Sequence, residues 1–134
     1  MTVQEARKEL KSYRKLLDMR KKRAERVEYL RTVQSRYTVN KYGTVTGRNP
    51  YKMEELIDKI EAAERAYVQS IADTVDSLAA IERKIEQLGE RHYKVLWEKY
   101  IEGKTYELIA VQQHYTYQWV RELETQGVNQ YARL

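Results

Sequence analysis

The side chains best suited to specific binding lie near the C-terminus, in residues 116–125. Gln118 and Arg121 are three positions apart, so a helix would place them on one face. A glutamine can hydrogen-bond the edge of adenine, and an arginine can hydrogen-bond guanine or a phosphate group. Glu122 and Glu124 add negative charge, which weakens attraction to phosphate. These residue types favour selective contacts over strong electrostatic binding.

Two short helices joined by a tight turn are predicted to position these side chains. Thr105 is a candidate cap for a helix over 105–113, and Thr116 is a candidate cap for the next helix. The first helix is expected to turn Leu108, Ile109 and Ala110 inward, and "HYT" at 114–116 is the turn. The inward positions of the second helix are Val120, Leu123 and Val128. This is the pattern of a helix-turn-helix, whose second helix can enter the major groove of DNA.

A third short helix is expected before this pair, in "ERHYKVLWEKYIEG", and it should end at Gly103. Its apolar side would carry Tyr93, Leu96, Trp97, Tyr100 and Ile101. We therefore predict three short helices around one small core in residues 90–134.

Residues 1–89 carry the pattern of two long helices, at about 2–38 and 51–88. Thr2 with Glu5 is typical of a helix start, Asn49 and Pro50 are a second start signal, and Gly89 is the expected stop. The loop 39–50 is rich in breakers and allows a short hairpin near Gly43. The second helix has apolar residues at coiled-coil spacing, interrupted by Glu64 and Thr74: Met53, Ile57, Ile60, Tyr67, Ile71, Leu78, Ile81, Ile85 and Leu88.

Charge divides the chain into three parts. Residues 1–52 hold 15 Lys and Arg against 5 Asp and Glu, residues 53–89 hold 4 against 9, and residues 90–134 hold 6 against 6. A basic helix beside an acidic helix favours antiparallel pairing, and the basic stretch is also a candidate for contact with a DNA backbone. The two roles are compatible, because one face can pack while another binds phosphate.

Composition excludes several classes of function. The chain has no cysteine, and its two histidines have no neighbouring ligand cluster, so we expect no metal or cofactor. We predict that it is not an enzyme, because it lacks a phosphate-binding glycine loop and a spaced set of catalytic residues. No segment has the apolar core of a signal peptide or of a membrane span. A cytoplasmic protein without membrane contact is expected.

The segment "VLWEKYIEGKTYELIAVQQHYTYQWVRELETQGV" resembles the fourth region of bacterial sigma factors. The matching positions are Val95, Leu96, Tyr100, Ile101, Gly103, Thr105, Leu108, Ile109, Ala110, Thr116, Val120, Arg121 and Val128. Lys99 stands where arginine is usual, and Gly127 stands where a helix-forming alanine is usual, so the last helix is expected to end early. Nearly the whole chain is similar to phage and prophage late transcriptional regulators of the RinA/ArpU type. That resemblance implies a DNA-binding activator of late phage genes in the cytoplasm of a bacterial host.

The combined prediction is an all-α protein: a long antiparallel coiled-coil hairpin (1–89) followed by a helix-turn-helix module (90–134). The candidate DNA-contacting residues are Thr105, Thr116, Tyr117, Gln118, Trp119, Arg121, Glu122 and Thr125. The candidate contacts to the DNA backbone are Arg14, Lys15, Arg20, Lys21, Lys22, Arg23 and Arg26.

The expected partners are double-stranded DNA, further copies of this chain (with a dimer favoured) and RNA polymerase. Two alternative functions stay open. One is a phage small terminase subunit that recognises DNA, although there the DNA-binding module often precedes the hairpin. The other is a protein-interaction module that docks on RNA polymerase without binding DNA.

Overall fold

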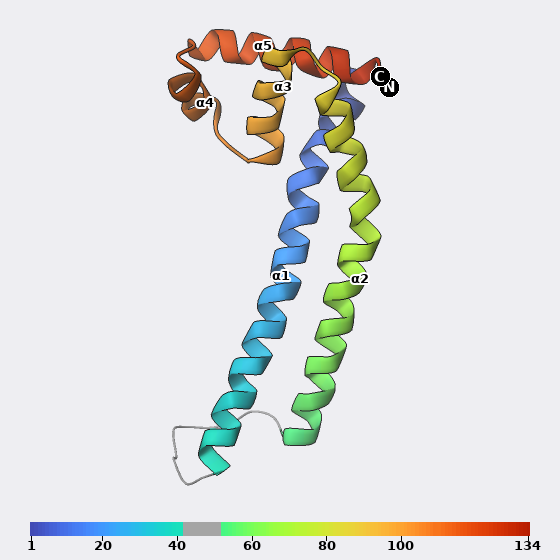
Figure 1. Cartoon of the computed structure of the whole chain (residues 1–134), viewed down its shortest axis with the longest axis vertical. Coiled ribbons are helices and arrows are strands. Elements are labelled where there is room, and N and C mark those ends of the chain that lie inside the picture. Colours follow the sequence, from blue (N-terminus) through green and yellow to red (C-terminus); the bar gives the residue numbers. More distant parts are fainter. Residues whose placement is uncertain (42–51) are drawn as a thin grey trace. The chain divides into compact units, whose positions relative to one another are not determined.

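A computed structural model describes residues 1–41 and 52–134, and all regular structure in these residues is helical. The elements are α1 (Val3–Lys41), α2 (Met53–Glu86), α3 (Glu90–Leu96), the π-helical segment η1 (Trp97–Ile101), α4 (Tyr106–Gln113) and α5 (Tyr117–Ala132) (Figure 1). The predicted all-α class is confirmed. Residues 39–41 belong to α1 rather than to the predicted loop. The rest of that loop, with the Asn49–Pro50 start signal and the hairpin near Gly43, lies outside the described residues.

The described chain divides into two compact units. The first unit is Met1–Leu17 with Val75–Leu134, and the second unit is Asp18–Thr74. Helices α1 and α2 each contribute to both units. The predicted domain boundary near residue 89 divides the chain differently and stays a prediction.

The first unit has two apolar clusters. One cluster combines α3, α4 and the first half of α5, and consists of Val95, Ile109, Ala110, Val120 and Leu123. The other joins the end of α5 to the start of α1, the end of α2, and α3 with η1; its buried members include Leu10, Ile85, Leu96, Tyr100, Val128 and Tyr131. The first cluster is the small core predicted for residues 90–134. Leu96, Tyr100 and Val128, which were also expected in that core, pack in the second cluster with α1 and α2, because α5 is long enough to pack at both ends.

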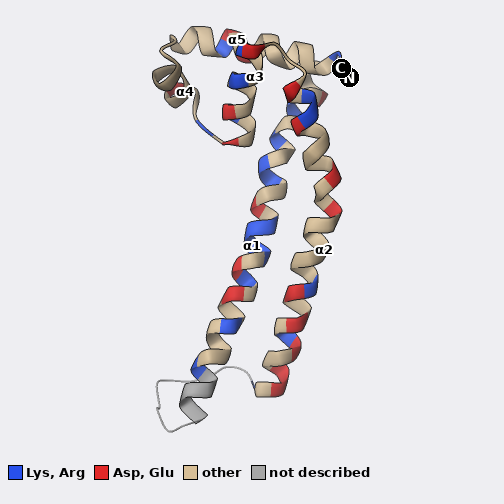
Figure 2. Ribbon diagram, in the orientation of Figure 1, with Lys and Arg blue, Asp and Glu red and all other residues tan. Residues whose placement is uncertain are grey.

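The second unit is held by a thinner core between α1 and α2. Leu30 and Val33 of α1 pack against Leu56 and Ile60 of α2. Farther along, Arg20 Nε donates a hydrogen bond to Thr74 Oγ1 at 2.6 Å, and its Nη2 donates to the Ile71 carbonyl. Figure 2 shows Lys and Arg along this part of α1 and many Asp and Glu near the start of α2. One ion pair joins these two helices in the described part of the unit, between Arg31 and Glu64.

The side-chain caps predicted from sequence are confirmed. The hydroxyls of Thr2, Thr105 and Thr116 accept hydrogen bonds from the backbone N–H groups three residues on, at 3.1, 3.2 and 3.1 Å. Each bond satisfies one N–H that has no partner within its helix. The prediction that Gly89 stops the second long helix is wrong. Helix α2 ends at Glu86, and Gly89, with φ of −58°, precedes α3 as its N-terminal cap residue.

The predicted apolar stripe of α2 is displaced near its start. Leu56 is fully buried, whereas Ile57, which the heptad pattern places inside, is 40% exposed. Tyr67 and Ile71 are half-buried, while Ser70 is buried. In the second unit the contact with α1 therefore includes Ile60 and Thr74 of the predicted stripe, and it is displaced from that stripe at Leu56 and Ser70.

Candidate functional site

The candidate site is built on the turn between α4 and α5. Helix α4 ends with His114 in the left-handed conformation, with φ of 59° and ψ of 38°. The backbone N–H of Tyr115 donates to the Ala110 carbonyl at 2.9 Å, and that of His114 donates to the Val111 carbonyl at 3.4 Å. This pair of bonds is a Schellman motif, which ends a helix sharply. Thr116 then caps α5, so only three residues, 114–116, separate the two helices.

We expect His114→Gly to raise the free energy of unfolding by about 0.5–1 kcal/mol. A side chain in the left-handed region costs roughly 1–2 kcal/mol, and glycine avoids that cost but loses more chain entropy on folding. His114 is exposed, so no packing is lost. Urea denaturation measures the change. The matched control is Gln112→Gly in the same helix, which should instead lose about 1 kcal/mol. A loss of stability in His114→Gly would contradict the prediction.

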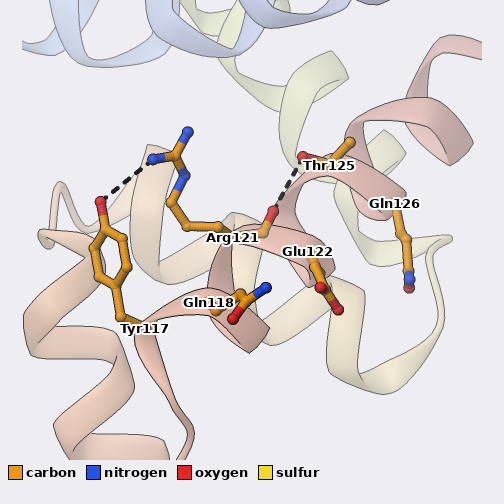
Figure 3. A pocket seen from close by; sticks show the side chains of 6 residues that line it. All are labelled: Tyr117, Gln118, Arg121, Glu122, Thr125 and Gln126. Atoms are coloured by element: carbon orange, nitrogen blue, oxygen red, sulfur yellow. Dashed lines mark hydrogen bonds between the residues drawn. The ribbon is translucent and has the colours of Figure 1, made fainter.

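The outer face of α5 carries a row of polar side chains along a shallow groove of about 520 Å³. The groove is lined by Tyr117, Gln118, Arg121, Glu122, Thr125 and Gln126 (Figure 3). All six residues are exposed, and they follow the helical spacing of three and four. Five of them were predicted as DNA-contacting residues. Gln126 was missed, although the same spacing would have included it, and its Oε1 lies 2.9 Å from His92 Nε2.

Arg121 is held by two aromatic rings. Its Nη1 donates a hydrogen bond to Tyr117 Oη at 3.4 Å, and its guanidinium carbon lies 5.4 Å from the centre of the Tyr106 ring and 5.8 Å from that of Tyr117. The two rings meet edge to face. The bond to Tyr117 raises the pKa of Arg121, and burial raises the pKa of Tyr106. The cluster therefore restrains a charged guanidinium on the exposed face of α5. The contribution of Tyr106 was not predicted, because that residue belongs to α4.

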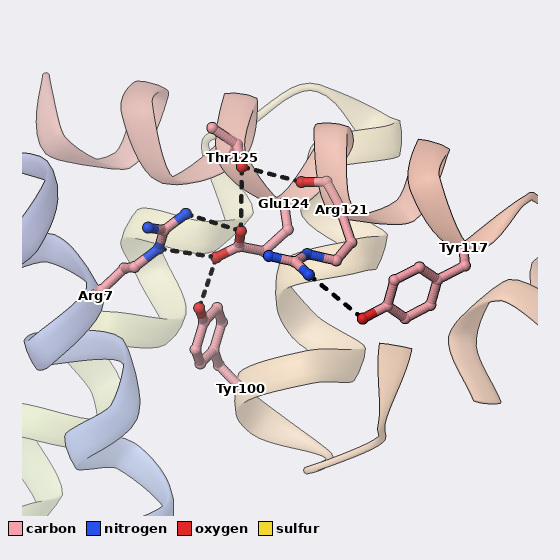
Figure 4. Close-up of polar contacts among 6 residues, drawn as sticks. All are labelled: Arg7, Tyr100, Tyr117, Arg121, Glu124 and Thr125. Atoms are coloured by element: carbon pink, nitrogen blue, oxygen red, sulfur yellow. Dashed lines mark hydrogen bonds and ion pairs between the residues drawn. The ribbon is translucent and has the colours of Figure 1, made fainter. Parts of the chain in front are cut away.

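Glu124, whose negative charge was expected to weaken attraction to phosphate, is only 2% exposed. Arg7 donates to its carboxylate twice, from Nε to Oε1 at 3.3 Å and from Nη2 to Oε2 at 3.0 Å. Tyr100 Oη donates to Oε1 at 2.7 Å, and Thr125 Oγ1 lies 3.5 Å from Oε2 (Figure 4). The hydrogen bond to Glu124 raises the pKa of Arg7, and burial followed by this carboxylate raises the pKa of Tyr100. The negative charge of Glu124 is thus neutralised inside the protein, and Glu122 is the one carboxylate in the outer row.

The resemblance to sigma-factor region four predicted that α5 ends early at Gly127. Gly127 is instead a point of close contact between α5 and α3. A Cβ atom at this position would lie 3.1 Å from Leu96 Cγ, so glycine allows α3 to cross close to α5. Helix α5 continues to Ala132, and the prediction of an early end is wrong. Leu108 is a second correction, because it was expected to point inward and is 43% exposed. Ile109 and Ala110 are buried as predicted.

The remaining predicted contact residues of this module have structural roles. The Thr105 and Thr116 hydroxyls serve as helix caps. Trp119 is half-buried and packs against the cluster formed with Val95. Within the outer row, the exposed Thr125 uses its Oγ1 to donate a hydrogen bond to the Arg121 carbonyl at 3.0 Å. The outer row therefore leaves Gln118 and Arg121 as the residues with the strongest capacity to recognise a base.

The predicted backbone-contact residues differ in their surroundings. Arg14 Nη1 donates to the Ile101 carbonyl at 3.2 Å, beside the turn in which Gly103 has φ of 74°. In the second unit, Arg20 Nε donates a hydrogen bond to Thr74 Oγ1 of α2. The other five are exposed, namely Lys15, Lys21, Lys22, Arg23 and Arg26. No ion pair in residues 1–36 and 52–134 involves these five side chains, although Arg26 lies over the Tyr29 ring.

In residues 1–41 and 52–134, no group of three or more His, Cys, Asp and Glu side chains is arranged to hold a metal ion. No helix in the same part of the chain has the length and apolarity needed to cross a membrane. The outer row of α5 can donate and accept hydrogen bonds with a polar partner.

Comparisons of this chain with protein-family models, curated proteins and solved structures found no match. The resemblance to sigma-factor region four and to phage late regulators therefore stays a prediction.

Proposed function

We propose that this chain is a sequence-specific DNA-binding transcriptional regulator in which α4 and α5 form a helix-turn-helix. Helix α5 is the recognition helix and enters the major groove. The observation that carries the proposal is the outer row of α5, where Gln118 and Arg121 are exposed directly after a capped three-residue turn. In the helix-turn-helix mode, side chains at the start of the second helix contact base edges. Gln118 reads adenine and Arg121 reads guanine.

The burial of Glu124 supports this role. An exposed carboxylate beside Arg121 would repel phosphate, whereas Glu124 is paired with Arg7. The outer row then contains one positive and one negative side chain, Arg121 and Glu122, and supplies little net attraction to DNA. Attraction to phosphate comes instead from the exposed lysines and arginines of α1 and from a second subunit. We infer that α1 and α2 form the predicted antiparallel hairpin arm, which is supported by their contacts within each unit.

The biological setting of the proposal comes from the similarity of this sequence to phage and prophage late transcriptional regulators. The regulator activates late genes of a temperate phage in the cytoplasm of a bacterial host. It acts as a homo-oligomer, with a dimer favoured, because two recognition helices then bind two half-sites of one operator.

Selection of bound duplexes from a random DNA library tests the proposal. We expect the wild-type chain to enrich one short motif with an adenine that depends on Gln118. Gln118→Ala should lose the preference at that position and bind the selected duplex about 5–100-fold more weakly, as expected for a lost bidentate base contact. The control Gln112→Ala changes an exposed glutamine on α4 outside the outer row, and should keep both motif and affinity. Lack of an enriched motif, or an unchanged motif in Gln118→Ala, would argue against a reading role.

A second candidate function is docking on a protein partner such as RNA polymerase. It is favoured by the outer side of α4, where Leu108 is 43% and Val111 is 73% exposed. These residues are three positions apart and form an apolar patch outside the outer row of α5. Binding of purified RNA polymerase by wild type, and its loss in Val111→Glu with DNA binding retained, would establish this function beside the first.

A further inference from the structure

The second unit has an apolar surface that its own two helices leave uncovered. The buried apolar cluster between α1 and α2 in this unit comprises Leu30, Val33, Leu56 and Ile60. Toward the other end of the unit, α1 and α2 meet through buried Ser70 and Thr74 and through the Arg20 hydrogen bonds. A pair of helices with so narrow a core gains further stability when another helix covers its open side.

A groove of about 550 Å³ lies on this surface, between the two helices of the unit. Its apolar lining comes from Ala24 and Val27 of α1 and from Tyr67 and Val68 of α2. Val68 is 64% exposed although it is a β-branched apolar residue in the middle of a helix. The groove therefore combines an apolar floor with an apolar side chain that projects into solvent.

The sequence pattern of α2 explains why this surface is apolar. The predicted coiled-coil stripe includes Ile57, Tyr67 and Ile71, which remain exposed or half-buried. Helix α1 packs instead against Leu56, which lies beside the stripe, and against Ile60 within it. Val68 follows Ile57 by eleven residues, or about three helical turns, so both lie on nearly the same side of α2. The unpaired edge of the stripe is thus continuous with the groove.

The charged residues around the groove indicate which partner fits. Glu28 and Arg31 stand on the α1 side, and Glu64 stands on the α2 side, where Arg31 and Glu64 form an ion pair. Glu61 and Arg65 lie in the adjoining hollow beside Val68. Both signs occur on this rim, which is unsuited to a polyanion such as DNA or an anionic membrane. A surface with both signs on its own rim can complement itself in a two-fold arrangement.

We propose that this groove is the site at which a second copy of the chain binds, through the same groove, to form a two-fold dimer. Val68 of each copy packs into the groove of the other, and the uncovered edge of the α2 stripe is buried between copies. Two pairs of helices then form a four-helix contact. The interface is independent of the recognition helix, so it can be tested without DNA.

Sedimentation analysis of the full chain at several concentrations tests the dimer. We expect wild type to have twice the chain mass at about 100 μM, and Val68→Glu to raise the dissociation constant at least about 100-fold, because an unpaired carboxylate would be buried. The control Ala62→Glu adds the same charge at an exposed position of α2 outside the groove and should remain dimeric. Circular dichroism should show equal helix content in all three proteins, since Val68 is exposed in the single chain.

A monomeric wild type, a ring of many copies, or a Val68→Glu variant as dimeric as wild type would each overturn the proposal. A second measurement tests the two-fold placement. The chain has no cysteine, so Val68→Cys introduces a single thiol. Because Val68 lies near the proposed two-fold axis, oxidation should link two copies, whereas Ala62→Cys should not link. A dimer in which Val68→Cys remains unlinked, or links no faster than Ala62→Cys, would contradict this placement.

Discussion

Replacing Arg7 by methionine is expected to destabilise the folded chain by about 3–5 kcal/mol, because the substitution leaves a buried carboxylate without its cation. Glu124 is 2% exposed and lies on α5, 117 positions along the chain from Arg7. Of its strong hydrogen-bond donors, only the Tyr100 hydroxyl would remain. Urea denaturation followed by circular dichroism measures the loss, and Arg91→Met is the control at an exposed arginine, with an expected change within about 0.5 kcal/mol.

Removing the carboxylate of the pair instead of its cation should lower the free energy of unfolding by less. Glu124→Leu leaves Arg7, whose side chain is 39% exposed and can regain contact with water, and it leaves the Tyr100 hydroxyl unpaired. The expected loss is about 1–3 kcal/mol, the cost of an unsatisfied buried polar group. The double variant Arg7→Met with Glu124→Leu should be more stable than Arg7→Met alone, because the stranded charge is gone. If Arg7→Met costs no more than Arg91→Met, the ion pair does not hold α5 in place.

This ion pair shows which features of the fold a sequence can reveal. The caps at Thr2, Thr105 and Thr116 were predictable, because each depends on a side chain and an N–H three residues apart. The role of Glu124 was not predictable, because it depends on Arg7 at the other end of the chain. The sequence of the segment 116–125 alone suggests that both Glu122 and Glu124 add negative charge to the exposed face of the helix, whereas Glu124 is buried. Only the tertiary contact shows which carboxylate faces solvent.

The errors at Gly89, Gly127 and Leu108 have a related cause. Glycine signals both helix ends and close packing, and its sequence context does not distinguish them. Gly127 lies inside α5 because Leu96 packs against it, and Gly89 precedes α3 rather than ending α2. Leu108 is apolar like its neighbours Ile109 and Ala110. The apolar cluster beneath α4, however, is formed by those two neighbours and does not include Leu108. Of the candidate site, the outer row of α5 was largely predictable from helical spacing, whereas the aromatic support from Tyr106 was not.

Replacing Arg121 by alanine should weaken binding to the selected duplex by about 10–100-fold, which corresponds to the loss of one bidentate contact to guanine. The guanidinium is restrained by Tyr106 and Tyr117 before DNA arrives, so less conformational freedom is lost on binding. Tyr117→Phe keeps the ring and removes the 3.4 Å hydrogen bond, and should weaken binding by only about 2–5-fold. Fluorescence anisotropy at one fixed salt concentration measures both effects, with Arg91→Ala as the control for the loss of an exposed positive charge.

A scrambled duplex of the same length separates base reading from charge. If Arg121 contacts guanine, Arg121→Ala loses affinity for the selected duplex and little for the scrambled one. Equal losses on both duplexes would mean that Arg121 holds a phosphate, because a phosphate contact carries no sequence information. An affinity for the selected duplex equal to that of Arg91→Ala would show that α5 is not the reading element. The exposed lysines and arginines of α1 would then be the DNA-contacting surface, and substitution of Lys21, Lys22 and Arg23 together would abolish binding that Arg121→Ala leaves intact.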